Sequence, residues 1–143
     1  MPRQTWTLTQ EDAHFLVDHS IKTAAEMGVA VTVAVVESSG VTVALLRMDD
    51  TKLASVRVAE GKAWTSALFQ RASSDYGAST APGNIGYGLQ NAFPAKLVPM
   101  IGGQPIFVNG TCIGGVGVSG AAGEQDDSIA KAAIAAFAKR IAA

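Results

Sequence analysis

The segment that decides the fold is PIFVNGTCIGGVGVS, residues 105–119. Asn109-Gly110 separates two runs rich in β-branched residues and glycine. Asn-Gly is the pair most favoured in a two-residue hairpin turn, where both residues need a positive φ. The segment therefore predicts an antiparallel hairpin with strands at 105–108 and 111–119.

A second hairpin is predicted nearer the N-terminus. Residues 29–37 and 41–48 are rich in valine and threonine, which favours strands, and three residues, Ser38-Ser39-Gly40, join them. Two hairpins indicate an antiparallel sheet. A further short strand is expected near residues 97–101.

Three helices are predicted around this sheet. The first begins after Thr9, whose hydroxyl can cap the amide three residues on, and ends at Gly28. The second covers 53–71 and carries a stripe of small side chains that would let it lie close on the sheet. The third begins at Asp126, where acidic side chains suit the positive end of the helix dipole.

Residues 73–104 are irregular and punctuated by prolines and glycines, with one short helical piece near 89–93. Segments of this length without periodicity usually form a binding loop, a lid or an interface. No linker or internal repeat divides the chain. We therefore predict one α+β domain over residues 1–143, with an antiparallel sheet flanked by helices.

The composition is apolar for a small domain. Of the 143 residues, 48% are hydrophobic and 16% charged, and the mean hydropathy is +0.25. Burial of part of the surface against other copies of the chain explains this balance, so a homo-oligomer, a dimer or higher, is expected. A membrane span is not expected, because Pro99, Pro105 and many glycines interrupt the longest uncharged run, 97–123.

Charge and cysteine content exclude further classes of protein. Eleven Lys and Arg against twelve Asp and Glu give a formal net charge of −1, without a basic stripe to bind phosphates, so no nucleic-acid partner is expected. A single cysteine, Cys112, allows no internal disulfide and fits a reducing compartment. The first six residues lack the apolar region of a secretory signal. A cytoplasmic location is therefore expected.

Residues 115–120, Gly-Val-Gly-Val-Ser-Gly, match the dinucleotide pattern G-x-G-x-x-G. The context argues against a nucleotide site, because the pattern lies in a hairpin strand and no βαβ unit follows. Two interpretations remain. The glycines can allow close packing of a helix, which we favour, or the amides of 119–123, beginning with Ser119 and Gly120, can hold a carboxylate or a cofactor.

His14 and His19 are the only histidines. The simpler interpretation places them on the surface or in an interface between copies, with Phe15 facing outward beside His19. The sharper hypothesis makes one of them the axial ligand of an iron porphyrin, with tyrosine, methionine or Cys112 as fallback ligands. Two histidines five apart without a thiolate do not make a zinc site, so no metal-ion site is predicted. Cys112 itself is expected in the core.

Four charged residues are candidates for catalysis if the chain is an enzyme. Arg47 ends a strand just before a helix, and Lys62 lies off the small-residue stripe, where a solvated lysine is the simpler interpretation. Glu124 and Asp126 either stabilise the last helix through its dipole or supply a base. A small acidic ligand would then sit where the second helix, the 47–49 strand end and the 119–123 turn converge.

The chain also resembles a known family. The matching residues are Arg47-Met48-Asp49, Lys62-Ala63 with Thr65, Gly102-Gly103 with Pro105-Ile106, Gly114, Gly117-Val118-Ser119-Gly120 and Glu124-Gln125-Asp126. In these it is similar to the GlcG/HbpS-like heme-binding domains, a family that includes the C-terminal domain of PduO-type corrinoid adenosyltransferases. The resemblance runs from about residue 8 to residue 141. It implies a profilin-like fold with about five antiparallel strands, oligomeric assembly, and heme or another tetrapyrrole as ligand in some members.

Two functional hypotheses result. The first is an intracellular oligomer that binds a small ligand, namely heme or a related tetrapyrrole. The alternative is a cofactor-independent enzyme that acts on a small organic acid in a catabolic pathway, for example an aromatic ring-cleavage product. The sequence leaves open whether the chain is an enzyme.

Overall fold

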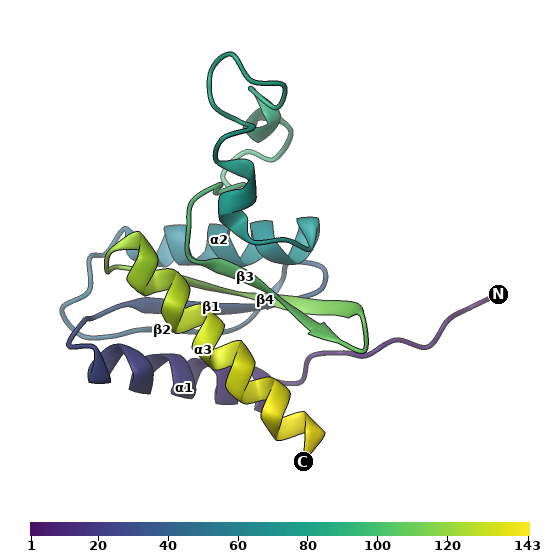
Figure 1. Ribbon diagram of the computed structural model, residues 1–143, viewed down its shortest axis with the longest axis vertical. Helices are drawn as coiled ribbons and strands as arrows, with labels where there is room; N and C mark the ends of the chain where they lie inside the picture. The colour runs from purple at the N-terminus through teal and green to yellow at the C-terminus, as the bar shows by residue number, and fades with distance from the viewer.

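The computed structural model describes all 143 residues as an α+β domain (Figure 1). In chain order the elements are α1 (Gln10–Glu26), β1 (Thr32–Glu37), β2 (Thr42–Arg47), α2 (Ser55–Phe69), the 3-10 helices η1 (Ser73–Tyr76) and η2 (Leu89–Ala92), β3 (Gly103–Val108), β4 (Thr111–Ser119) and α3 (Gly123–Ala142). Both predicted hairpins are present, and β1 also pairs with β4. The strands form one antiparallel sheet in the order β2-β1-β4-β3.

The sheet is covered on both faces. Helices α1 and α3 lie on one face and α2 lies on the other (Figure 1). Because side chains alternate along a strand, Val33 and Val35 of β1 join the larger core with α1 and α3, whereas Ala34 and Val36 pack under α2. The small alanines of α2 complete this second, thinner layer, as the sequence predicts.

The sheet has four strands rather than about five. The segment expected to add a short strand, 97–101, does not pair with the sheet but lies against α2. The Val98 amide donates to Thr65 Oγ1 at 2.9 Å, and the Val98 side chain fills the space where a side chain on Gly61 would be. Leu97 is buried there. Residues 97–101 therefore pack on the outer side of α2 and do not form a fifth strand.

Helix starts largely follow the predicted signals. The Thr9 hydroxyl accepts from the Asp12 amide at 3.1 Å and the Asp12 carboxylate accepts from the Thr9 amide at 3.0 Å, a reciprocal capping box. Helix α3 begins at Gly123, three residues before the predicted start, so Asp126 lies within its first turn. The helix dipole still favours acidic residues at this end.

The glycines of β4 serve packing, as the favoured interpretation of the G-x-G-x-x-G pattern predicts. A Cβ on Gly115 would lie 2.6 Å from the Ala63 carbonyl oxygen, and one on Gly117 would lie 2.5 Å from the Ala63 amide nitrogen. Only hydrogen at these positions lets the α2 backbone lie directly on the strand.

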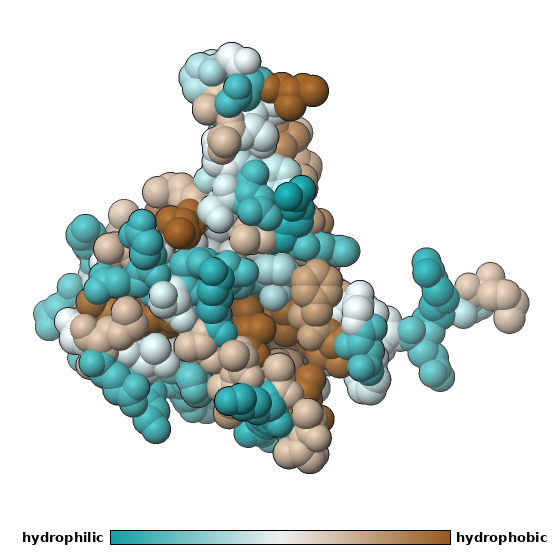
Figure 2. Space-filling view, viewed as in Figure 1, coloured by the Kyte–Doolittle hydropathy of each residue, from teal (hydrophilic) through white to brown (hydrophobic).

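Residues 77–95 project from the domain as an irregular arm (Figure 1). Ile85 and Tyr87 on this arm are exposed, and Figure 2 shows brown, hydrophobic surface on one side of its tip beside polar surface. Between Gly77 and Ala95 the arm carries no charged residue. No helix of the chain is long and apolar enough to cross a membrane.

Candidate functional site: a histidine groove and a buried ion pair

Helix α1 presents His14 to a groove beside the edge of the sheet. The groove is lined by Gln10, Glu11 and His14 of α1 and by Val43 and Ala44 of β2, and its volume is ≈ 470 Å³. β2 is an edge strand, so its apolar side chains have neighbours on one side only. The groove therefore combines an imidazole with apolar strand surface.

The His14 imidazole is free to bind a ligand. Its side chain is 77% exposed, and its nearest charged neighbour is Asp18, with Nε2 3.8 Å from Oδ1. This distance is too long for a hydrogen bond, so Asp18 lies near the ring without fixing it. His14 thus combines exposure with a groove whose apolar lining comes from Val43 and Ala44.

His19 lies one turn further along α1 and is less available. It is half-buried, its Nδ1 lies 3.4 Å from Thr23 Oγ1, and its ring centre is 6.1 Å from that of Phe15. The expectation that Phe15 faces outward is wrong. Phe15 packs against Phe137 of α3, and the Arg140 guanidinium lies 4.8 Å from the Phe15 ring centre.

Lys62 and Asp126 form an ion pair inside the protein. Lys62 Nζ lies 3.3 Å from Asp126 Oδ2 and donates to the Val118 carbonyl oxygen at 2.8 Å. The side chains are only 3% and 4% exposed, so the expectation of a solvated lysine is wrong. A Cβ on Gly102 would lie 2.8 Å from Lys62 Nζ, so the backbone of this glycine covers the ammonium directly.

Burial controls the electrostatics of this pair. Desolvation lowers the pKa of Lys62, while the neighbouring Asp126 carboxylate opposes this change. Desolvation likewise raises the pKa of Asp126, and Lys62 opposes it. Both groups are therefore held closer to their neutral forms than they would be in water.

The structure brings together two of the four candidate catalytic residues, Lys62 and Asp126. The Arg47 guanidinium instead donates to the Thr51 carbonyl oxygen at 3.4 Å, and Glu124 is exposed and takes part in no ion pair. The arrangement joins α2 to the start of α3 and presents no open acid–base pair to solvent.

The amides of the 119–123 turn already have partners. The Ala121 amide donates to Asp126 Oδ1 at 3.0 Å, and the Ala122 amide donates to Gln125 Oε1 at 3.1 Å. Ser119 is buried at the end of β4, opposite Thr32 of β1. The carboxylate that these amides were suited to hold is therefore the chain's own Asp126, and Ser119 and Gly120 do not line the histidine groove.

The fallback heme ligands are less suitable than His14. Tyr76 packs against Phe69, with ring centres 4.6 Å apart, and Tyr87 is exposed on the arm. Cys112 is buried, as predicted, and desolvation raises the pKa of its thiol, which disfavours the thiolate that binds iron. A larger apolar depression of ≈ 550 Å³ beside Phe107 and Phe137 has no histidine, tyrosine, cysteine or methionine in its lining.

Sequence reasoning missed the burial of Lys62 and the polar contacts around Asp127. The Asp127 carboxylate accepts from Gln104 Nε2 at 2.7 Å and pairs with Lys131 at 3.0 Å, which ties β3 to α3. One signal for the buried lysine was available: Lys62 stands between Gly61 and Ala63, and such small neighbours let other segments approach a helix closely.

Comparison with known proteins agrees with this fold. The chain is 34% identical over 131 residues to the corrinoid adenosyltransferase PduO of Citrobacter freundii, covering 92% of this chain but only 39% of that relative's length. The crystal structure of the Klebsiella pneumoniae protein ORFY superposes with a TM-score of 0.92 at 32% identity, covering 96% of this chain and 94% of that one. The crystal structure of a PduOC:heme complex superposes with a TM-score of 0.87 at 35% identity, covering 92% and 95%.

The family model for haem-degrading proteins of the HbpS-like type matches residues 8–135. That range contains α1 with both histidines, the whole sheet and the Lys62–Asp126 pair. The chain therefore belongs to the HbpS-like family.

Proposed function

We propose that this chain binds heme or a related tetrapyrrole in the groove between α1 and β2, with His14 as the axial ligand. The observation that carries the proposal is an exposed imidazole beside apolar strand surface in a groove of ≈ 470 Å³. Imidazole is the common protein ligand of heme iron, and apolar side chains suit the porphyrin face. The heme complex of a structure that is 35% identical supports the same ligand class.

The residues present fit one face of such a ligand. His14 would hold the iron, and Val43 and Ala44 would contact the porphyrin ring. Bound iron porphyrin supplies redox chemistry. The chain's own contribution is to bind and orient the ring and to keep water from the face turned toward β2.

The opposite face of the ligand would remain open to water in a single chain. We therefore include a homo-oligomer in the proposal, formed through apolar surface that a single chain leaves exposed. Ile85 and Tyr87 on the arm and Leu45 and Leu46 on the edge strand are large hydrophobic side chains in exposed positions. An interface between copies would cover these side chains and remove their apolar surface from water.

We do not extend the proposal to catalysis by Lys62, Asp126, Arg47 and Glu124. Lys62 and Asp126 are buried, and neither Arg47 nor Glu124 contacts them. Turnover of a small organic acid would require a substrate to reach an ammonium that already donates to the Val118 carbonyl oxygen. The geometry favours a structural role for this pair.

A hemin titration tests the proposal. The Soret band should shift saturably at micromolar protein, and His14→Ala should abolish or shift that band while His19→Ala, the matched control on the same helix, should leave it unchanged. Following the saturated band over time with and without a reductant separates binding from degradation of the porphyrin. Spectra unchanged in both variants would contradict histidine ligation, and the absence of saturation would contradict specific binding.

A further inference from the structure

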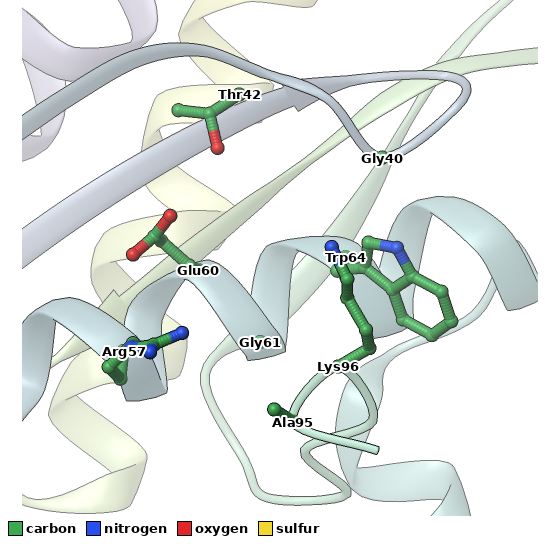
Figure 3. A pocket seen from close by; sticks show the side chains of 8 residues that line it. All are labelled: Gly40, Thr42, Arg57, Glu60, Gly61, Trp64, Ala95 and Lys96. Atoms are coloured by element: carbon green, nitrogen blue, oxygen red, sulfur yellow. The ribbon is translucent and has the colours of Figure 1, made fainter. Parts of the chain in front are cut away.

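A separate pocket of ≈ 130 Å³ lies on the α2 side of the sheet. Its walls come from the β1–β2 turn with the start of β2, from one face of α2, and from Ala95 and Lys96 at the end of the arm (Figure 3). Six of its lining residues bear on what it can bind: Gly40, Thr42, Arg57, Glu60, Trp64 and Lys96. Because α1 covers the opposite face of the sheet, this pocket is distinct from the histidine groove (Figure 1).

Three charged side chains line this small pocket without partners. The chain contains five ion pairs, and none of them includes Arg57, Glu60 or Lys96. No hydrogen bond within the chain engages their charged ends or the Thr42 hydroxyl. Two cations and one anion around ≈ 130 Å³ therefore present a net positive charge together with one strong acceptor.

The aromatic wall of the pocket is held in place. The Trp64 ring packs against Phe93 and Phe69, with ring centres 5.3 and 6.4 Å apart. A Cβ on Gly40 would lie 2.5 Å from Trp64 Cδ1, so a larger residue would displace the indole. Ala95 has a φ of 60°, a conformation uncommon for a residue with a side chain, immediately before Lys96. Such a backbone outlier is an observed strain of the kind that occurs at ligand sites.

We propose that this pocket binds a small carboxylate that also carries a hydrogen-bond donor, that is, a short hydroxy or amino acid. Arg57 and Lys96 would bind the carboxylate, which pairs most strongly with such cations. Glu60 would accept from the hydroxyl or ammonium group, and Trp64 would contact the carbon chain. A volume of ≈ 130 Å³ lies well below the roughly 300–1,000 Å³ of pockets that hold drug-sized ligands. This size suits a ligand of three or four carbons and excludes a porphyrin.

Trp64 itself reports binding. In a Trp6→Phe background it is the sole tryptophan, so its fluorescence can be titrated with four probes of nearly equal size. L-Lactate has the carboxylate and a hydroxyl donor, L-alanine the carboxylate and an ammonium, propionate the carboxylate alone, and L-alaninamide the ammonium without the carboxylate. Ligands of this size bind weakly, so each is titrated to about 10 mM.

The expected result is saturable binding of lactate or alanine, which also distinguishes a hydroxy-acid site from an amino-acid site. Propionate should bind about tenfold more weakly, and alaninamide should not bind. Arg57→Gln or Lys96→Gln should weaken the binding about tenfold, since each removes a charge-assisted hydrogen bond. Lys22→Gln, an exposed lysine on α1, is the matched control and should change nothing.

Several results would overturn the proposal: no saturation with lactate or alanine, equal binding of propionate, binding of alaninamide, or binding that survives both Arg57→Gln and Lys96→Gln. Thermal melts confirm that these surface variants remain folded. Hemin titration of the same variants should match the wild type. The outcome at this pocket is therefore read independently of the outcome at His14.

Discussion

Replacing Asp126 with asparagine should leave the Lys62 ammonium buried with only the weaker influence of the Asp127 carboxylate as a counter-charge. Asparagine keeps the shape of the side chain and an oxygen that can accept from the Ala121 amide, so the change removes mainly the charge. Breaking a buried ion pair by removing one partner typically costs about 3–5 kcal/mol of unfolding free energy. The cost has an upper limit, because Lys62 can release its proton instead.

That limit follows from the pKa of 10.5 that a lysine side chain has in water. Holding such a lysine neutral at pH 7 costs about 5 kcal/mol, at 1.36 kcal/mol per pKa unit. The unfolded chain then binds one more proton than the folded chain at neutral pH, so the stability of Asp126→Asn should rise with pH as it approaches 10.5. Urea unfolding of the variant and the wild type at about pH 7 and about pH 9.5 measures the difference at each pH.

The matched control is Glu124→Gln, two residues earlier in the same helix turn. Glu124 is exposed and unpaired, so its loss should cost only the dipole contribution, a few tenths to about 1 kcal/mol. The double variant Lys62→Met with Asp126→Asn should recover most of the loss, since it removes the buried charge and keeps the acceptor for the Ala121 amide. A deficit for Asp126→Asn below about 1 kcal/mol, or one that does not diminish toward high pH, would refute this account of the pair.

Three further predictions concern packing and assembly. Gly117→Ala should destabilise the domain by about 3 kcal/mol or more in urea, because the new methyl group overlaps the α2 backbone. Gly83→Ala on the arm has no neighbour within 4 Å and should cost only its backbone strain at a φ of 87°, about 1–2 kcal/mol; equal costs would contradict the close packing. The Cys112 thiol should react with an alkylating reagent far more slowly than an exposed thiol, since it is buried and its pKa is raised, and labelling of the native chain as fast as that of the urea-unfolded chain would contradict this. Light scattering should give a mass above the 14.7 kDa of one chain, and the double variant Ile85→Ser with Tyr87→Ser should lower that mass if the arm forms the interface between copies. A wild-type mass of one chain at working concentration would exclude the oligomer.

Local signals in the sequence predicted the local structure well. Asn109 and Gly110 have φ values of 48° and 78°, as a two-residue hairpin turn of this type requires. Thr9 caps α1 because a hydroxyl at that position satisfies a free amide within three residues of it. The family resemblance, which rested on residues spread through the chain, is confirmed by the match over residues 8–135.

The parts that sequence reasoning missed depend on segments far apart in the chain. Lys62 looked like a solvated lysine because its neighbours Gly61 and Ala63 show only that some segment can approach closely, not that Gly102, forty residues later, covers its ammonium. Phe15 looked outward because its own helix does not cover it, whereas Phe137 and Arg140 of α3 do. Periodicity identifies the face that a helix turns to its nearest layer, but it does not reveal a second layer contributed by another part of the chain.

The edge strand β2 links the two sites that we propose. Val43 and Ala44 line the histidine groove, whereas Thr42, the residue before them, lines the polar pocket under α2. The register pairs Ala44 with Val35 and Thr42 with Val36 and leaves Val43 of β2 as an extra residue, so Ala44 and Thr42 face opposite sides of the sheet. An edge strand is held by hydrogen bonds on one side only, so it yields more easily than β1 or β4. A ligand at one site that shifts β2 would change the affinity of the other site for its own ligand. Linkage requires the ligand of the second site to change the affinity of the first site by the same factor.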